Sequence, residues 1–373
     1  MTLDQEPVLV INPGSSSLKW GCFRTTASTQ PILSDSVELN EIESSFENIA
    51  KKFNISLVVV RYVHGGPQYH SPLLITDDIL ESLPMLDEYA PMHNPLSRWC
   101  VDKAKLWFKS SVRIVAVFDT EYFHDLPKVS QAYSLPRALI KKYGIRRYGF
   151  HGFAHDGMYQ YLCSRKKEFN VNLNRTITIQ LGSGCSMAAI KNGFPIDTTM
   201  GFTPNEGLLM ATRSGDIDSG LLTWLQAKEG WDHKLTENVL TKESGWYGMS
   251  GLNTDMQLLI QDQEPTSRLA VELFIWRIRK ALGAYFAILG GLDSVIISGG
   301  IAENNPQFCQ TLLMELNHLG IEVDNYFKVT SDLPIELSSQ LSTVKCWVVA
   351  NQEFQSMLAS TKRGLQEFNQ QRT

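Results

Sequence analysis

The chain has 373 residues, of which 43% are hydrophobic and 20% charged, and its formal net charge is −5. This is the composition of a globular protein long enough for two domains, and the lack of dense Lys/Arg clusters argues against a nucleic-acid partner. No apolar run approaches the roughly 20 residues of a membrane span, and the N-terminus lacks the order of a signal peptide. The six scattered cysteines form no Cys-x-x-Cys pair, which favours a cytoplasmic location over a disulfide scaffold.

Runs rich in β-branched residues alternate with helical patterns along the chain. The expected strands are residues 8–11, 57–60, 114–118, 176–181, 295–298 and 344–349. The expected helices are residues 79–86, 95–109, 267–289 and 305–319. This alternation predicts an α/β protein.

Two stretches far apart in the chain share one layout. Residues 8–23 (VLVINPGSSSLKWGCF) and 177–193 (ITIQLGSGCSMAAIKNG) each read as strand, small-residue turn, strand. A hairpin tip of Gly and Ser offers backbone N–H groups and hydroxyls to phosphate oxygens. Either stretch alone could be an ordinary, unrelated hairpin. A similar hairpin in each half of the chain, however, suggests a duplicated fold. A third Gly-rich turn, 298–304, follows a strand and opens a helix, where a nucleotide could bind.

Polar residues gather in short blocks at the expected strand ends, which is where ligands bind in open α/β sheets. The blocks are residues 60–66, 90–95, 117–120, 147–155, 197–204 and 211–216. Taken singly, their members have ordinary explanations. Arg61 could form a surface ion pair, Asp119 could cap a helix, and His151 could be a structural histidine.

In this order, however, the blocks resemble the acetate kinase family of short-chain carboxylate kinases. The resemblance rests on Asn-x-Gly-Ser-Ser-Ser-Leu-Lys at 12–19 and Thr-Pro-x-Glu-Gly-Leu-x-Met-x-Thr-Arg-Ser-Gly-Asp-Ile-Asp at 203–218. It extends to Arg-x-Val-His-Gly-Gly (61–66), His-Asn-Pro (93–95), Phe-Asp-Thr (118–120), Arg-Tyr-Gly-Phe-His-Gly (147–152) and Gly-Ile-x-Glu-Asn (300–304). These motifs cover nearly the whole chain.

The resemblance implies a duplicated actin/sugar-kinase/Hsp70-like (ribonuclease H-like) α/β fold, with two domains and a central cleft. The N-terminal domain would be residues 1–125 with a returning helix at 356–373. Residues 126–355 would bind the nucleotide and form a homodimer. The implied activity is reversible, ATP- and Mg²⁺-dependent phosphorylation of acetate to acetyl phosphate by direct in-line transfer.

The chemistry of that reaction agrees with the residues. Acetate is already ionised at neutral pH, so the difficulty is to bring two anions together and to stabilise the transferring charge. The resemblance assigns catalysis to Arg61, Asp119, His151 and Arg213, and the planar fork of arginine suits both carboxylate and phosphoryl oxygens.

The remaining site residues are also assigned by the resemblance. The apolar cup for the substrate methyl would be Val63, Met92, Phe150 and Pro204. Phosphate and nucleotide would meet Asn12, Ser15, Ser17, Lys19, Gln180, Gly182, Ser183, Gly184, Gly299, Gly300, Ile301 and Asn304. Magnesium would be held by Asn12 and Glu353.

The chain departs from the family pattern on the phosphate side. The family's His-Leu-Gly-Asn-Gly reads Gln180-Leu181-Gly182-Ser183-Gly184 here, and Gln352 stands in place of a glutamate linked to magnesium. A neutral amide is a weaker ligand for a hard cation. Three hypotheses follow: a working acetate kinase with altered phosphate and metal contacts, an enzyme with another phosphoryl donor or one working mainly toward ATP, and a weakened relative that binds nucleotide or carboxylate as a sensor or partner. A kinase of propionate or another short-chain carboxylate is a further alternative.

Overall fold

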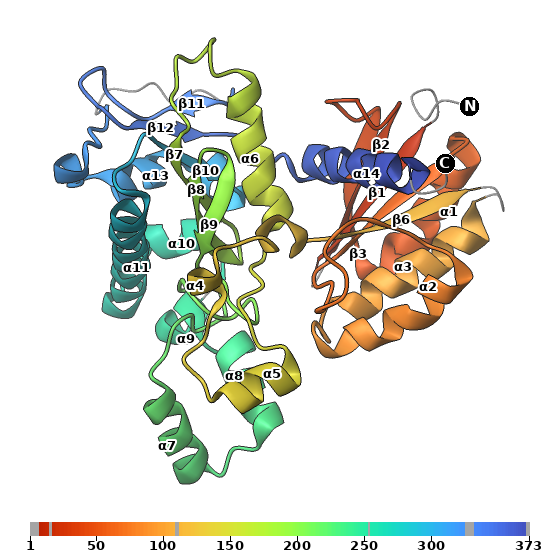
Figure 1. The fold of residues 1–373 in the computed structure, drawn as a ribbon. Coiled ribbons are helices and arrows are strands. Elements are labelled where there is room, and N and C mark those ends of the chain that lie inside the picture. The colour runs from red at the N-terminus through yellow and green to blue at the C-terminus, as the bar shows by residue number, and fades with distance from the viewer. Residues whose placement is uncertain (1–6, 15–16, 109–111, 253, 325–331, 371–373) are drawn as a thin grey trace. The chain divides into compact units, whose positions relative to one another are not determined.

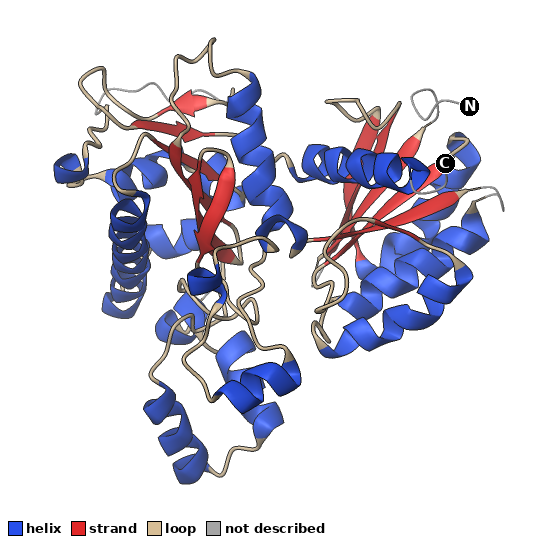
Figure 2. Ribbon diagram, viewed as in Figure 1, coloured by secondary structure: helices blue, strands red, loops and turns tan. Residues whose placement is uncertain are grey.

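The chain folds into two α/β units, each built on a six-stranded sheet (Figures 1 and 2). This computed structural model describes residues 7–14, 17–108, 112–252, 254–324 and 332–370. Unit 1 runs to His124 and resumes at Gln352, while unit 2 is Asp125–Asn351. The boundaries of these two units lie close to the domain boundaries expected from the sequence. The domain boundaries stay a prediction.

Unit 1 is a mixed sheet with helices on both faces. Its strands are β1 (Val8–Pro13), β2 (Ser17–Phe23), β3 (Leu33–Glu38), β4 (Leu57–Tyr62), β5 (Leu73–Leu74) and β6 (Arg113–Phe118). Its α-helices are α1 (Ile42–Lys52), α2 (Asp77–Ser82), α3 (Asn94–Trp107) and α14 (Glu353–Gln370). Short 3-10 turns cover Leu39–Glu41, Leu83–Glu88 and Glu121–Phe123. Helix α14 packs across β1, β4 and β6 (Figure 1).

The central strands of unit 1 are parallel and buried on both faces, which explains their continuous β-branched sequences. β1 pairs in parallel with β4, and β4 with β6. Alternate residues such as Leu9 and Val58 enter the core that α1 and α3 close. This parallel register brings the ends of β4 and β6, where Arg61 and Asp119 stand, to one edge of the sheet.

Unit 2 contains the second sheet and most of the helices. Its strands are β7 (Arg175–Leu181), β8 (Cys185–Lys191), β9 (Phe194–Thr198), β10 (Ser294–Ser298), β11 (Ile335–Glu336) and β12 (Lys345–Val348). Its helices are α4 (Lys128–Gln131), α5 (Arg137–Tyr143), α6 (Gly152–Ser164), α7 (Ser219–Glu229), α8 (His233–Lys242), α9 (Gly245–Ser250), α10 (Met256–Gln261), α11 (Pro265–Leu289), α12 (Gly300–Asn304) and α13 (Pro306–Leu313), with a 3-10 turn at Asn317–Leu319.

The two sheets share one topology, so the expected duplication is confirmed. In unit 1 the strand order is β3-β2-β1-β4-β6-β5, and in unit 2 the equivalent order is β9-β8-β7-β10-β12-β11. In each sheet, the first three strands along the chain pair in antiparallel fashion. Two further strands run parallel to the first strand, and a short antiparallel strand forms one edge. The two stretches of similar layout form the hairpins β1–β2 and β7–β8, at the same place in each sheet.

One expected helix is shorter than its sequence pattern indicated. The prediction of a helix over 305–319 is wrong beyond Leu313, because Met314 is extended and Glu315 has a φ of 65°. Arg279 of α11 donates hydrogen bonds to the carbonyl oxygens of Thr311, Leu312 and Met314 at 2.9–3.1 Å. A cation that satisfies the last carbonyls favours a helix end there.

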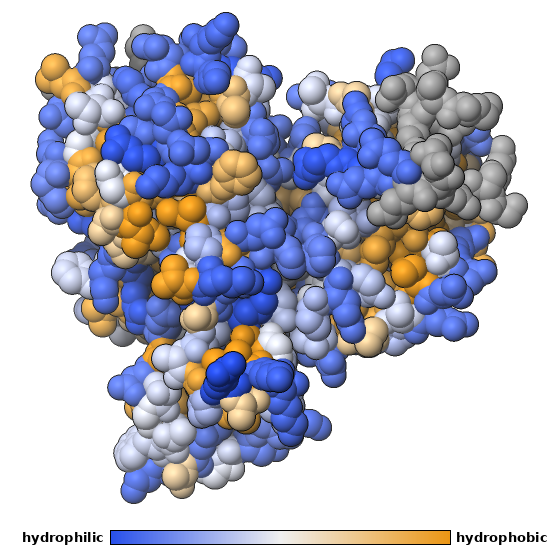
Figure 3. All heavy atoms as spheres, in the orientation of Figure 1, coloured by the Kyte–Doolittle hydropathy of each residue, from blue (hydrophilic) through white to orange (hydrophobic). Residues whose placement is uncertain are grey.

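The surface in Figure 3 is mostly hydrophilic, with apolar patches between the polar residues. Among the described residues, no helix combines the length and the apolar character needed to cross a bilayer.

We expect Phe274→Ala to destabilise unit 2 strongly. Phe274 of α11 is fully buried and contacts the rings of Trp246 and Phe308, at centroid distances of 5.2 and 6.1 Å. Removing a buried phenyl ring costs about 3–5 kcal/mol. Thermal melting checks this, with exposed Glu272→Ala on the same helix as the control. Equal melting temperatures for the two variants would contradict the expected core role.

Candidate active site

In unit 1, Arg61 joins the ends of three strands. Its Nη2 donates to Asp119 Oδ2 at 2.8 Å, and its Nη1 donates to Asn12 Oδ1 at 3.1 Å and to the Pro13 carbonyl at 3.2 Å. The Arg61 and Asp119 side chains are only 11% and 2% exposed. The structure therefore brings together three of the residues that the sequence singled out.

Glu353 completes this cluster from the first turn of α14. Asn12 Nδ2 donates to Glu353 Oε2 at 2.9 Å, so the asparagine bridges the arginine and the glutamate. Burial by itself would lower the pKa of Arg61, but the charges of Asp119 and Glu353 outweigh it and raise that pKa above its ordinary value. The guanidinium is thus a permanently charged group with a fixed orientation.

The other predicted phosphate residues of unit 1 lie on β2. Lys19 is exposed and stands opposite Asn12 in the β1–β2 register, so both side chains are on one face of the sheet. Ser17 begins β2, and its carbonyl accepts a hydrogen bond from the Gly14 N–H at 2.8 Å. Ser15 lies outside the described residues.

The four residues expected to form the apolar cup are divided between the units. Val63 and Met92 belong to unit 1, where Val63 is buried and Met92 is 54% exposed. Asn94 fixes the backbone at Val63, since its Oδ1 accepts from the Val63 N–H at 3.2 Å. Phe150 and Pro204 belong to unit 2, where Phe150 is buried and Pro204 partly buried.

In unit 2, His151 and Arg213 meet over Gly184. A Cβ at Gly184 would lie 3.3 Å from His151 Nε2 and 3.6 Å from Arg213 Nη1. His151 caps α6 with a left-handed φ of 57°, and its Nδ1 contacts Ser186 Oγ at 2.8 Å. The glycine leaves room for an imidazole and a guanidinium beside the hairpin tip.

Arg213 has an unusual environment for a partly buried cation. Its Nη1 donates to the Pro204 carbonyl at 3.0 Å, and no ion pair links it to a carboxylate among the described residues. Burial lowers the pKa of its guanidinium below the ordinary value, with nearby Cys185 opposing the shift. Burial likewise raises the pKa of the Cys185 thiol to about 12, which keeps the thiol neutral. The positive charge of Arg213 is therefore available to an anion.

Arg147 holds the loop that carries Pro204. Its Nη1 donates to the carbonyl oxygens of Thr198, Thr199 and Met200 at 3.1–3.3 Å, and its Nη2 donates to Glu206 Oε1 at 2.6 Å. Arg147 was part of a motif in the sequence, but its structural role in this loop was not foreseen.

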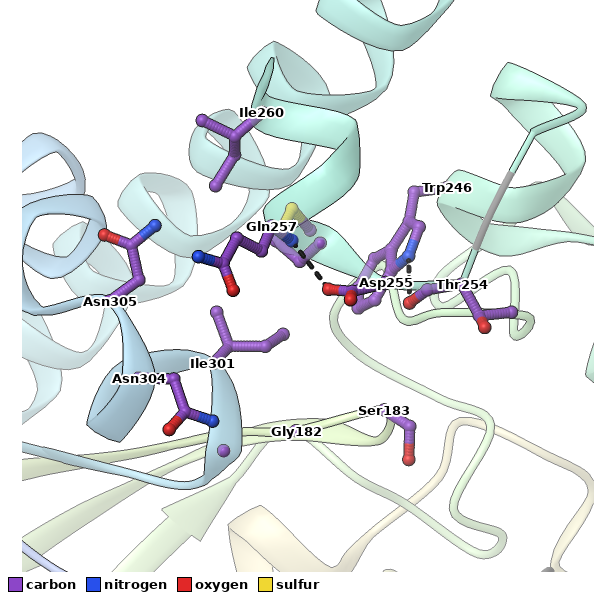
Figure 4. Close-up of a pocket in the computed structure, with 12 residues that line it drawn as sticks. Gly182, Ser183, Trp246, Thr254, Asp255, Gln257, Ile260, Ile301, Asn304 and Asn305 are labelled. Atoms are coloured by element: carbon purple, nitrogen blue, oxygen red, sulfur yellow. Dashed lines mark hydrogen bonds between the residues drawn. The ribbon is translucent and has the colours of Figure 1, made fainter. Parts of the chain in front are cut away.

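Next to the β7–β8 hairpin tip lies a pocket of about 250 Å³ (Figure 4). Five of the predicted nucleotide residues line it: Gly182, Ser183, Gly300, Ile301 and Asn304. The other wall of the pocket was not predicted from the sequence, and it consists of Trp246, Thr254, Asp255, Met256, Gln257, Ile260 and Asn305. These residues belong to segments with no recognisable motif.

The missed wall combines apolar surface with amide groups. Trp246 is fixed by its Nε1 donating to the Thr254 carbonyl at 3.0 Å, and Asp255 caps α10 by accepting from the Gln257 N–H at 2.9 Å. In Figure 4, the side-chain amides of Gln257 and Asn305 lie above Ile301 of α12. Such a lining suits a flat, partly polar ligand such as a nucleoside.

Gly299 and Gln180 lie behind this pocket. Gly299 has a φ of 101°, and a Cβ there would be 2.4 Å from the Leu181 carbonyl oxygen and 2.8 Å from Gln180 Nε2. The Gly299 N–H donates to Glu303 Oε1 at 2.9 Å. Gln180 is 8% exposed, and its Oε1 has no hydrogen-bond partner among the described residues. A buried amide oxygen without a partner is costly unless a ligand or water satisfies it.

The described residues contain no group of three or more His, Cys, Asp or Glu side chains placed to hold a metal ion. Mg²⁺ in phosphoryl-transfer sites usually keeps several waters and takes one or two carboxylates plus phosphate oxygens. Glu353 and Asn12 fit that smaller requirement, because a carbonyl oxygen such as Asn12 Oδ1 can accept from Arg61 and still offer a second lone pair.

Comparison with known proteins gives one consistent result. A family model described as "Acetokinase family" matches residues 37–360. The acetate kinase of Chloroherpeton thalassium is 36% identical over 355 residues, covering 91% of this chain and 84% of the relative. That of Bacteroides thetaiotaomicron is 34% identical over 390 residues, covering 93% of this chain and 96% of the relative.

Solved structures agree with the sequence comparison. The Porphyromonas gingivalis acetate kinase superposes with a TM-score of 0.82 at 30% identity, covering 96% of this chain and all of that one. A propionate kinase from Francisella tularensis gives a TM-score of 0.83 at 28% identity, covering 95% of this chain and 99% of that one. With its duplicated topology and its motifs in family order, this chain belongs to the acetokinase family.

Proposed function

We propose that this chain is an acetate kinase, which transfers a phosphoryl group reversibly and in line between ATP and acetate. Its membership of the acetokinase family supports the reaction class. The observation that carries the proposal within the molecule is Arg213. A partly buried guanidinium without a carboxylate partner among the described residues is costly, and an anionic substrate removes that cost.

Arg61 and Arg213 would each hold an anion. Arg61 is oriented by Asp119 and Asn12, so that it can bind the acetate carboxylate without reorganising. Arg213 and His151 would stabilise the charge on the transferring phosphoryl group, which is the main task in this chemistry.

A sugar kinase is the main alternative on this type of fold. Such an enzyme needs a base to deprotonate the hydroxyl of its substrate. Asp119 is the obvious base, but it is 2% exposed and accepts from Arg61 at 2.8 Å. A carboxylate that is engaged by a cation is a weak base. Acetate is already ionised and needs no base, so the ion pair between Asp119 and Arg61 favours a carboxylate substrate. The sensor alternative is also disfavoured, since simple binding requires neither His151 nor the second arginine.

The phosphoryl donor would lie along the two hairpins. The pocket beside Ile301 and Gln257 suits the nucleoside, and this supports ATP over pyrophosphate. Gln180 and Ser183 would contact the donor's phosphates as neutral groups, and a phosphate-bound water could satisfy Gln180 Oε1. Lys19 and Ser17 would contact phosphate from unit 1, as would Ser15.

Magnesium would be held by Glu353 and Asn12, with phosphate oxygens and water as its other ligands. When bound, it would neutralise phosphate charge. Asn12 would orient Glu353 through the 2.9 Å hydrogen bond and Arg61 through its amide oxygen.

The acid chosen would depend on Val63, Met92, Phe150 and Pro204, the proposed apolar cup. One methylene in such a pocket is worth about 1–3 kcal/mol, so the preference for acetate over propionate would be graded. The structural likeness to a propionate kinase keeps propionate as the second candidate substrate.

We also propose a cytoplasmic homodimer. All six cysteines are free in the structure, as expected in a reducing compartment. Helix α7 has no buried residue although it carries Leu221 and Trp224, which are 45% and 56% exposed. Contiguous exposed apolar side chains commonly mark a protein interface, and a second copy of the chain would cover them.

The function is tested by trapping acyl phosphate as a hydroxamate, with ATP and Mg²⁺ and separately with acetate, propionate and butyrate. We expect the highest kcat/KM with acetate, less with propionate and least with butyrate. A parallel series has pyrophosphate in place of ATP. Folded protein that binds nucleotide but forms no acyl phosphate from any pair would leave only the sensor alternative.

Arg213→Ala should lower kcat by about 10²–10³, since a preorganised donor to the transferring group is lost. Because Arg213 forms no ion pair with a carboxylate among the described residues, its removal should not lower the melting temperature by more than a few degrees. Arg277→Ala is the matched control, as this arginine of unit 2 donates to the Asp216 carbonyl at 3.0 Å and should be dispensable. Near-normal turnover by Arg213→Ala would remove the residue from the mechanism.

Gln352→Glu should lower the Mg²⁺ concentration for half-maximal activity by about tenfold, because it adds a carboxylate next to Glu353. The measurement is a Mg²⁺ titration at fixed ATP. Gln355→Glu places the same charge on α14, where Gln355 donates to the Thr29 carbonyl, and should leave the titration unchanged. An unchanged midpoint in Gln352→Glu would mean that Glu353 alone already fills the role.

A further inference from the structure

Behind His151 runs a line of buried polar side chains in unit 2. Ser186 Oγ lies 2.8 Å from His151 Nδ1 and 2.8 Å from His155 Nε2, and His155 Nδ1 lies 2.8 Å from Thr178 Oγ1. Thr178, Ser186 and His155 are completely buried. The line therefore leads from the edge of the candidate site into the core.

The local structure explains why these groups meet. His151 and His155 are four residues apart at the start of α6, so they lie on one face of the helix. Ser186 of β8 stands opposite Gln180 of β7, and Thr178 lies two residues before Gln180 on the same side of the sheet. Helix α6 packs on β7, which brings both imidazoles against these hydroxyls.

The hydrogen count makes the line directional. Ser186 has one hydroxyl hydrogen but contacts two imidazole nitrogens, so it can donate to one and accept from the other. If Thr178 donates to His155 Nδ1, then His155 Nε2 donates to Ser186 and Ser186 donates to His151 Nδ1. In a neutral imidazole only one nitrogen carries hydrogen, so in this direction the hydrogen of His151 is on Nε2. If His155 Nδ1 instead donates to Thr178, the whole line reverses and the hydrogen of His151 is on Nδ1.

We propose that Ser186, supported by His155 and Thr178, is a positioning residue that keeps the hydrogen of His151 on Nε2. The Nε2 edge is the one that faces Gly184, and Arg213 Nη1 lies beside the same glycine. A donor there can reach a phosphoryl oxygen, whereas the opposite tautomer would present a lone pair to an anion. The proposal rests on the proposed function for the direction of the line and for the effect on turnover, whereas the tautomer itself is measured without the reaction.

The test compares Ser186→Ala with Thr176→Val. Thr176 is a buried hydroxyl on the same strand as Thr178, but it contacts the Leu173 carbonyl and Ser294 instead. Both variants lose one buried hydroxyl, and only one of them interrupts the line. Thr178→Ser should behave as the unmutated protein, because it keeps the hydroxyl.

Two readouts are used. The first is long-range ¹H–¹⁵N NMR of protein labelled at histidine, which distinguishes hydrogen on Nδ1 from hydrogen on Nε2, with His151 assigned by its loss in His151→Gln. The second is kcat and KM for acetate. We expect Nε2–H at His151 in the unmutated protein and an altered tautomer in Ser186→Ala, with kcat lowered by about tenfold to a hundredfold and KM nearly unchanged.

Three results would overturn the proposal: hydrogen on Nδ1 in the unmutated protein, an unaltered His151 tautomer in Ser186→Ala, or an equal loss of kcat in Thr176→Val. If the unmutated protein phosphorylates no carboxylate, the proposed function fails, and the tautomer measurement still decides on the positioning role.

Discussion

The ion pair between Arg61 and Asp119 is the interaction that connects the candidate site residues of unit 1. It connects the ends of β4 and β6, and through Asn12 and Pro13 it reaches β1. Burying two charges costs several kcal/mol in lost hydration, and only hydrogen bonds of good geometry offset it. Here the same contacts that satisfy the charges also fix the direction of the guanidinium. Helix α14 joins through Glu353, so the C-terminal segment takes part in the same cluster.

The duplicated topology shows how one framework supports two different kinds of chemistry. By their hairpin registers, Asn12 of β1 corresponds to Gln180 of β7, and Lys19 of β2 corresponds to Ser186 of β8. In unit 1 these two positions hold Asn12, an amide within an ionic cluster, and Lys19, an exposed cation. In unit 2 they hold a buried amide and a hydroxyl between two imidazoles. The first unit thus offers fixed charges, whereas the second combines neutral donors with Arg213, a partly buried cation.

Features determined by neighbouring residues or by strand order could be predicted from the sequence. Parallel strands buried on both faces read as β-branched runs, and Arg61 and Asp119 could be expected to meet because they end adjacent strands. The pocket wall at Trp246 and Gln257 could not, because it comes from segments distant in sequence with no motif. The end of α13 was missed for a similar reason, as the capping donor is Arg279 of another helix. Ser186 gave no signal, since a serine in a buried strand becomes notable only when its two neighbours are placed.

The burial of the cysteines has a practical consequence for chemical labelling. Thiol reagents attack the thiolate, and burial raises the pKa of Cys22 to about 11 and that of Cys185 to about 12. Cys100, Cys309 and Cys346 are buried too, and only Cys163 is partly exposed. Cys163 lies near the C-terminal end of α6, the helix that His151 caps. A maleimide fluorophore would therefore attach to the native chain at one main position, on the helix that His151 caps and that carries His155.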